Sequence, residues 1–151
     1  MPSSDYRPSI DDIGARMYAR TLDANGKRYG TFTAITTPNA AAVDALIDDA
    51  LATVEAAVGG NIDGGFLTTA KACVIWNTAM LIELSYFPES TESGDSAYKA
   101  YQERYEDMLK HLKEAIEQDQ PGDKKIVSLK MESVVRLPGS RLDPWANELF
   151  P

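Results

Sequence analysis

Cysteine and histidine are almost missing from this sequence: Cys73 and His111 are the only residues of their types in 151 positions. A single cysteine forms no internal disulfide, so nothing about the chain requires an oxidising compartment. The first residues lack a charged-then-apolar signal pattern, and no apolar run approaches the roughly eighteen residues that a membrane span needs. We therefore expect a soluble protein that is made in the cytoplasm and has no membrane partner.

Positive charge is also scarce. Lysine and arginine total 15 against 23 aspartate and glutamate residues, which gives a net charge of −8 and a pI near 4.6. Because such a chain repels phosphate backbones, a protein that reads nucleic-acid sequence is not expected. The remaining composition, with 44% hydrophobic and 25% charged residues, is typical of one globular domain and excludes collagen-like, disulfide-scaffold and wholly disordered chains.

Apolar residues recur at helical spacing over most of the chain. Ser9 precedes an isoleucine and two acidic residues, which predicts a helix over about 10–18. Thr37 and Pro38 predict the start of a second helix, with the threonine as its cap and the proline in its first position. Gly59 and the glycine after it predict the left-handed end of that helix.

Two longer helices are predicted next. The third, over about 66–87, is apolar on nearly every side and is predicted to be the central, most buried element. A proline ends it, and a polar loop leads to a fourth helix, which has a single apolar seam and an outer face that we expect to be solvated. The members of that seam are Tyr98, Tyr101, Tyr105, Met108, Leu112 and Ala115.

Two segments depart from the helical pattern. Asn25 and Gly26 form the dipeptide best suited to a type I′ turn, which predicts a small β-hairpin at about 19–34. After residue 120 the apolar residues alternate, which predicts a β-strand in an extended C-terminal arm over 121–151. The predicted fold class is therefore all-α: a four-helix bundle over 1–120 with a small β-hairpin insertion, followed by that arm.

The C-terminal arm is also the candidate for contact with a partner. A lone strand cannot satisfy its own backbone hydrogen bonds, so it needs another element or another chain to pair with. Aromatic side chains near a terminus are typical of residues that dock into a partner. The candidate docking residues are Ile126, Val127, Leu129, Met131, Val135, Trp145, Leu149 and Phe150.

Residues that carry chemistry are few. His111 has no serine or cysteine that spacing brings near it, and we expect it to be a solvated surface residue. Cys73 lies in the most apolar helix, without the basic surroundings that lower a thiol pKa. The glycine-rich stretch 59–65 follows a helix rather than a strand, lacks the ending of a phosphate-binding loop and contains acidic Asp63. We expect no catalytic residue, no metal ligand and no cofactor.

Several short stretches occur in a set order along the chain. They are Tyr6-Arg7-Pro8-Ser9-Ile10-Asp11-Asp12-Ile13-Gly14, Ala19-Arg20-Thr21, Asn25-Gly26, Gly30-Thr31-Phe32-Thr33, Thr37-Pro38, Ala79-Met80-Leu81-Ile82-Glu83-Leu84-Ser85-Tyr86-Phe87-Pro88-Glu89 and Ser96-Ala97-Tyr98. Their order and spacing, over about residues 6–117, resemble the head-to-tail adaptor (connector) proteins of tailed bacteriophages, particularly phages of actinobacteria. The residues beyond 120 match no such pattern.

The resemblance implies a structural role at the head–tail junction of a virion. Such adaptors are small helical proteins that form a ring, usually dodecameric, beneath the portal protein. The ring extends the DNA channel and presents a surface to the next connector (stopper) or tail component, while genomic DNA passes through the lumen without sequence-specific binding. An acidic wall suits a channel, because like charge keeps the duplex from adhering as it slides.

Two other functional classes remain open. A helix-turn-helix DNA-binding regulator can be drawn over residues 43–86, although its reading helix offers Lys71 as its one cation, whereas typical DNA readers cluster several. An enzyme of unknown type, with a site shared between subunits, is the other. The sparse polar residues argue against that enzyme.

Overall fold

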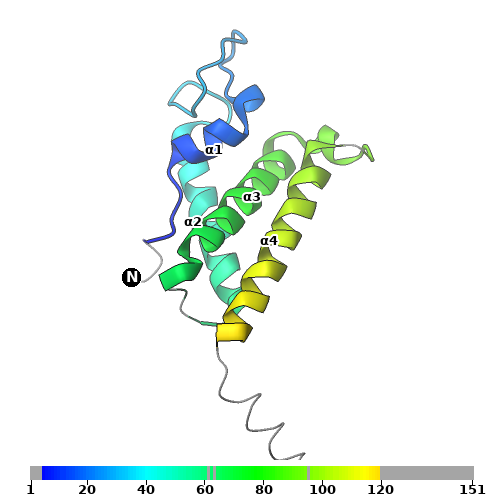
Figure 1. Cartoon of the computed structure of the whole chain (residues 1–151). Helices are drawn as coiled ribbons and strands as arrows, with labels where there is room; N and C mark the ends of the chain where they lie inside the picture. The colour runs from blue at the N-terminus through cyan, green and yellow to red at the C-terminus, as the bar shows by residue number, and fades with distance from the viewer. Residues whose placement is uncertain (1–4, 61, 63, 95, 120–151) are drawn as a thin grey trace, which may run out of the picture. The chain divides into compact units, whose positions relative to one another are not determined.

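The computed structural model describes residues 5–60, 62, 64–94 and 96–119 of the chain (Figure 1). The chain divides into two compact units, Met1–Ala115 and Ile116–Pro151. The described part of the second unit is only the final turn of the last helix. The predicted C-terminal arm and its strand lie outside the described residues.

Helices dominate the described part of the chain, and no strand is found there. They are α1 (Ile10–Arg16), η2 (Tyr18–Arg20), α2 (Ala40–Val58), η3 (Gly64–Phe66), α3 (Leu67–Tyr86), η4 (Pro88–Thr91) and α4 (Ala97–Asp119), where η marks a short 3-10 helix. This confirms the all-α class and the four predicted α-helices, whose bounds differ from the predictions at several ends.

Helix α1 is capped as the sequence predicts but is shorter. The Ser9 hydroxyl oxygen accepts a hydrogen bond from the Asp12 amide at 3.1 Å, and the Asp12 carboxylate accepts one from the Ser9 amide at 2.9 Å. These two bonds form a capping box. The predicted end at residue 18 is wrong, because Met17 leaves helical geometry at φ −116° and ψ 36°. A short 3-10 helix, η2, follows the buried Met17 side chain.

The start of α2 also differs from the prediction. Thr37 is not the cap: Asn39 is, and its side-chain oxygen accepts a hydrogen bond from the Ala42 amide at 2.9 Å. Pro38 therefore precedes the cap instead of occupying the first helical position, and the peptide bond before it is cis. The end of α2 is as predicted, with Gly59 in the left-handed region at φ 79°.

The predicted hairpin is a loop with a tight turn in the structure. A tight turn forms one residue earlier than predicted, because the Gly26 amide donates to the Asp23 carbonyl at 3.0 Å. Its central residues are thus Ala24 and Asn25, and Gly26 follows them with φ 80°. The paired strands do not form: the described loop has only two isolated antiparallel bridges, between Leu22 and Arg28 and between Asp23 and Thr36. Backbone amides of the loop donate instead to the side chains of Asp23 and of the buried Thr21 and Thr36.

Helix α3 is the most buried element, as predicted, and packs along α2 (Figure 1). Its buried residues are Ala70, Cys73, Val74, Asn77, Thr78, Ala79, Ile82 and Glu83. Contrary to the sequence expectation, the segment Gly64–Tyr86 is long and apolar enough to cross a membrane by length and composition alone. Of its most apolar window 44% is buried inside the domain, where α3 packs along α2, and the core helix of a globular protein can meet the same criterion.

Helix α4 lies beside α3 through aromatic side chains. The rings of Trp76 and Tyr101 stack with their centroids 5.8 Å apart. Within the predicted seam Leu112 is completely buried, whereas Tyr101, Tyr105 and Met108 are half-buried. The predicted solvated outer face is confirmed by a run of exposed charged residues along the helix.

The crossing of α1 over the loop at residues 30–31 depends on Gly14. A Cβ atom at this position would lie 2.7 Å from the Thr31 Cα and 2.8 Å from the Gly30 carbonyl oxygen. We expect Gly14→Ala to lower the free energy of unfolding by about 1–3 kcal/mol, because two backbone segments must move apart. Urea unfolding followed by circular dichroism measures this change. Gly60→Ala is the control, since a Cβ atom added there would meet no non-neighbouring atom within 4 Å. A Gly14→Ala protein as stable as the wild type would contradict the close packing of α1 on the loop.

Candidate functional site

The residues that could carry chemistry do not gather in one place. His111 is exposed on α4, whereas Cys73 is completely buried on α3. Burial raises the pKa of the Cys73 thiol to about 11, as expected for an inert buried cysteine. Within the described ranges, no group of three or more histidine, cysteine, aspartate or glutamate side chains is placed to hold a metal ion.

An ion pair joins the completely buried carboxylate of Glu83 to the guanidinium of Arg20, whose side chain is 30% exposed. The Glu83 carboxylate on α3 has no exposed surface, and it accepts hydrogen bonds from Nε and Nη2 of Arg20, both at 2.8 Å. The Ser90 hydroxyl oxygen lies 2.7 Å from the same carboxylate. The guanidinium carbon of Arg20 lies 4.0 Å from the centroid of the Phe87 ring. This cluster therefore joins η2, the end of α3 and η4.

The two charges on α3 are both matched by residues from the N-terminal part of the chain. Lys71 pairs with Asp12 of α1 at 2.9 Å, and Glu83 pairs with Arg20 of η2. The sequence reasoning missed the second pair. Its one available signal was a carboxylate within the last turn of an apolar helix, where a buried unpaired charge is very unfavourable. Sequence alone does not identify the partner, which lies 63 positions away.

A second cluster combines arginine and aromatic side chains from three helices. The guanidinium carbons of Arg16 on α1 and Arg104 on α4 lie 5.6 and 4.8 Å from the ring centroid of Trp76 on α3. The ring of Tyr101 on α4 also stacks on Trp76. Burial and the charge of Glu83 raise the pKa of the Tyr101 hydroxyl, while Arg20 and Arg104 act in the opposite direction. We call these four residues, Arg16, Trp76, Tyr101 and Arg104, the arginine–aromatic surface.

Apolar side chains are exposed near the end of the domain that holds the loop at 21–36. Tyr18 and Ile35 each expose more than half of their surface, and Leu84 exposes half. Tyr86, at the end of α3, is also exposed. The loop and the connection from α3 to α4 lie at the same end of the helices (Figure 1). These residues give that end an apolar character.

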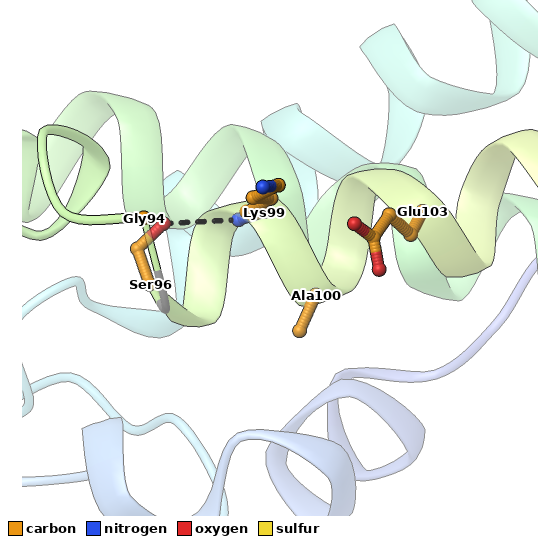
Figure 2. A pocket seen from close by; sticks show the side chains of 5 residues that line it. All are labelled: Gly94, Ser96, Lys99, Ala100 and Glu103. Carbon is orange, nitrogen blue, oxygen red and sulfur yellow. Dashed lines mark hydrogen bonds between the residues drawn. The ribbon is translucent and has the colours of Figure 1, made fainter.

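A shallow depression lies at the start of α4, with a volume of about 280 Å³. It is lined by Gly94, Ser96, Lys99, Ala100 and Glu103 (Figure 2). The Ser96 hydroxyl oxygen accepts a hydrogen bond from the Lys99 amide at 3.2 Å and caps the helix. Lys99 and Glu103 are both exposed and lie on the same helix. Nothing in this arrangement activates a nucleophile or a water molecule.

The candidate docking residues lie outside the described residues, so the structure does not bring them together with any surface. No protein-family model, curated protein or solved structure matches the chain. The function must therefore be argued from the short stretches in the sequence and from the contacts described above.

The buried ion pair gives a direct test of stability. We expect Glu83→Gln to lower the free energy of unfolding by about 3 kcal/mol, because the Arg20 charge then faces a neutral amide in a largely buried site. Chemical denaturation measures the loss. Asp44→Asn is the matched control, since Asp44 is half-exposed and Arg7 also contacts Asp48 at 2.9 Å; this change should cost less than about 1 kcal/mol. Equal losses in the two variants would contradict the structural role of Glu83.

The thiol of Cys73 gives a test of burial. With its pKa raised to about 11 by desolvation, little of the thiol is ionised at pH 8. We expect its reaction with a thiol reagent to be roughly a hundredfold or more slower in the folded protein than in guanidinium chloride. The absorbance of the released chromophore measures both rates. Rapid labelling of the folded protein would show that α3 is accessible.

Proposed function

We propose that this chain is a structural virion protein, a head-to-tail adaptor that works in several copies. The copies form a ring, dodecameric in the virion, beneath the portal protein and extend the DNA channel. The ring docks a stopper or tail protein, and genomic DNA passes without base-specific contact. In this role the chain binds other proteins and catalyses no reaction.

The observation that carries the proposal is the location of the stretches that resemble the adaptor family. The Tyr6 hydroxyl donates to Glu55 of α2 at 3.0 Å, and Arg7 bridges two aspartates of the same helix at 3.0 and 2.9 Å. Arg20 holds Glu83, as described above. These residues connect the N-terminal segment to α2 and α3 and line no reaction site. The resembling stretches thus contribute residues that hold helices together, which supports a structural role for the chain.

The arm supplies the contacts that a ring subunit needs. Its alternating apolar residues over Ile126 to Arg136 form the proposed strand, which adds to an edge of the portal or of a neighbouring copy. Trp145 and Phe150 are the proposed anchors, since aromatic side chains give most contact area for little conformational entropy. The helical frame then positions the arm.

A DNA-reading function is less well supported by the described residues. In a helix-turn-helix protein the second helix must expose several cations to the major groove. Here that helix is α3, which is the most buried element. Its one cation, Lys71, is already paired with Asp12. The geometry therefore favours the adaptor over the regulator.

Removal of the arm tests the proposal. We expect a chain that ends at Gln120 to keep the helical circular dichroism of the described domain, because the core residues of α1 to α4 all precede that position. We expect it to lose attachment to heads that carry the portal, since the proposed strand and anchors are gone. Co-sedimentation with such heads measures attachment. Full attachment of the shortened chain would contradict the proposed role of the arm.

A further inference from the structure

The arginine–aromatic surface brings two exposed arginines to one tryptophan ring, and no neighbouring carboxylate of the described residues neutralises either of them. Arg16 and Arg104 are exposed, and among the described residues neither has a carboxylate oxygen within 4.0 Å. In contrast, the guanidinium groups of Arg7 and Arg20 both pair with carboxylates. Acidic residues outnumber basic ones by 23 to 15, so partners of opposite charge are plentiful in the chain. The two free arginines are thus available to a ligand.

The geometry of the surface holds these two charges together. Their guanidinium carbons are at most about 10.4 Å apart, since they lie 5.6 and 4.8 Å from one ring centroid. Two exposed positive charges repel each other when they lie within the Debye length, which is about 8 Å at physiological ionic strength, and they repel only weakly near the upper limit of this separation. The indole of Trp76 offsets part of that repulsion through cation–π contacts. A ligand with two negative charges at matching positions would offset the rest.

The chemistry of arginine defines what such a ligand contains. A guanidinium that rests on an aromatic ring leaves its other face free to stack and its N–H edge free to donate to an oxyanion. Trp76 is already covered by Tyr101 and by the arginines, so a ligand meets the guanidinium groups first. The matching ligand is a peptide that carries carboxylates close to aromatic rings.

The C-terminal end of this sequence contains two pairs of a carboxylate and a nearby aromatic residue. Asp143 is followed two positions later by Trp145, and Glu148 is followed two positions later by Phe150. The two carboxylates are five positions apart, a separation that an extended chain spans in up to about 17 Å and a bent chain in less. One acid-and-aromatic unit is therefore available for each arginine.

We propose that the arginine–aromatic surface of one copy binds residues 143–150 of a neighbouring copy. Asp143 and Glu148 pair with the two guanidinium groups, and Trp145 and Phe150 stack against their free faces. This inference rests on the proposed function, because a ring requires each copy to present one surface and to occupy another. It goes further in naming both surfaces of the contact between copies.

A peptide titration tests the recognition itself. The probe is residues 142–151 as an acetylated, amidated peptide, and the receptor is the full chain with Asp143→Asn, Trp145→Ala, Glu148→Gln and Phe150→Ala, which removes competition from its own arm. We expect saturable binding by calorimetry, weakened at least roughly tenfold by Arg16→Gln with Arg104→Gln. Binding should also weaken as salt is raised.

Matched variants separate this contact from general charge and from loss of fold. Arg28→Gln with Lys113→Gln removes the same charge from other exposed positions and should leave peptide affinity unchanged. Arg16→Lys with Arg104→Lys keeps the charge but loses the planar group, and should bind with intermediate affinity. Circular dichroism of each variant shows whether it is folded. No peptide binding, or equal loss in both charge-matched pairs of variants, would overturn the proposal.

A mixing experiment tests whether the contact joins two copies. One variant carries Arg16→Gln and Arg104→Gln with an intact arm, and the other is the arm variant with an intact surface. Above the measured dissociation constant of the peptide, the mixture should sediment faster than either variant alone. Unchanged sedimentation despite peptide binding would overturn a contact between copies.

The remaining outcomes distinguish this inference from its premise. Duplex DNA at low salt that binds through Arg16 and Arg104, with no binding of the peptide, would overturn the proposal in favour of a phosphate ligand. If the peptide does not bind but attachment to heads still depends on the arm, this inference is wrong and the adaptor function is unaffected. If the peptide binds but attachment to heads does not depend on the arm, the contact between copies stands and the adaptor function is contradicted.

Discussion

The ion pair between Arg20 and Glu83 is the contact on which the arrangement of the domain depends. A carboxylate with no exposed surface is tolerable only when its charge is matched and its oxygens accept hydrogen bonds, and here both conditions are met. To reach Glu83, Arg20 must approach the end of α3, which fixes η2 against that helix. Through η2 the pair also restrains α1 and the loop that follows. Since Ser90 and Phe87 join the same cluster, the connection towards α4 is held by it as well.

Sequence reasoning succeeded where local patterns determine structure. The 3.6-residue periodicity located α2, α3 and α4, and the lack of a polar face on α3 indicated its central position. The Ser9 cap of α1 and the left-handed end of α2 at Gly59 are equally local and were also predicted. These features depend on residues within four positions of each other, so the sequence shows them directly.

Sequence reasoning missed two kinds of feature. In one kind, neighbouring residues are equally good candidates for the same role, and in the other the partner residue is distant in the sequence. Thr37 and Asn39 are both good caps, and only the path of the chain from the loop selects Asn39. A turn near Gly26 was predicted, but the loop around it is held by side-chain hydrogen bonds that compete with a strand ladder. The Arg20–Glu83 pair and the Arg16–Trp76–Arg104 contacts join residues far apart in the chain. No local pattern predicts them.

Ion pairs and apolar packing connect the helices of the described domain. Other charged and apolar side chains are exposed and take no part in these contacts. Among the described residues, Cys73 is completely buried and His111 is exposed, and exposed apolar and arginine side chains lie elsewhere on the surface. Exposed Tyr18, Ile35 and Leu84 lie on the helical unit, as do Arg16 and Arg104, whereas the proposed anchors Trp145 and Phe150 belong to the C-terminal sequence. A part that assembles with copies of itself would use both sets.

Electron microscopy of the full-length protein with portal-bearing heads tests this account most directly. In negatively stained images we expect ring-shaped density added at the portal vertex, made of many copies of the chain. Heads that remain bare at that vertex, with the protein present as single copies at concentrations well above those of the heads, would contradict the central claim that this chain is an assembly component.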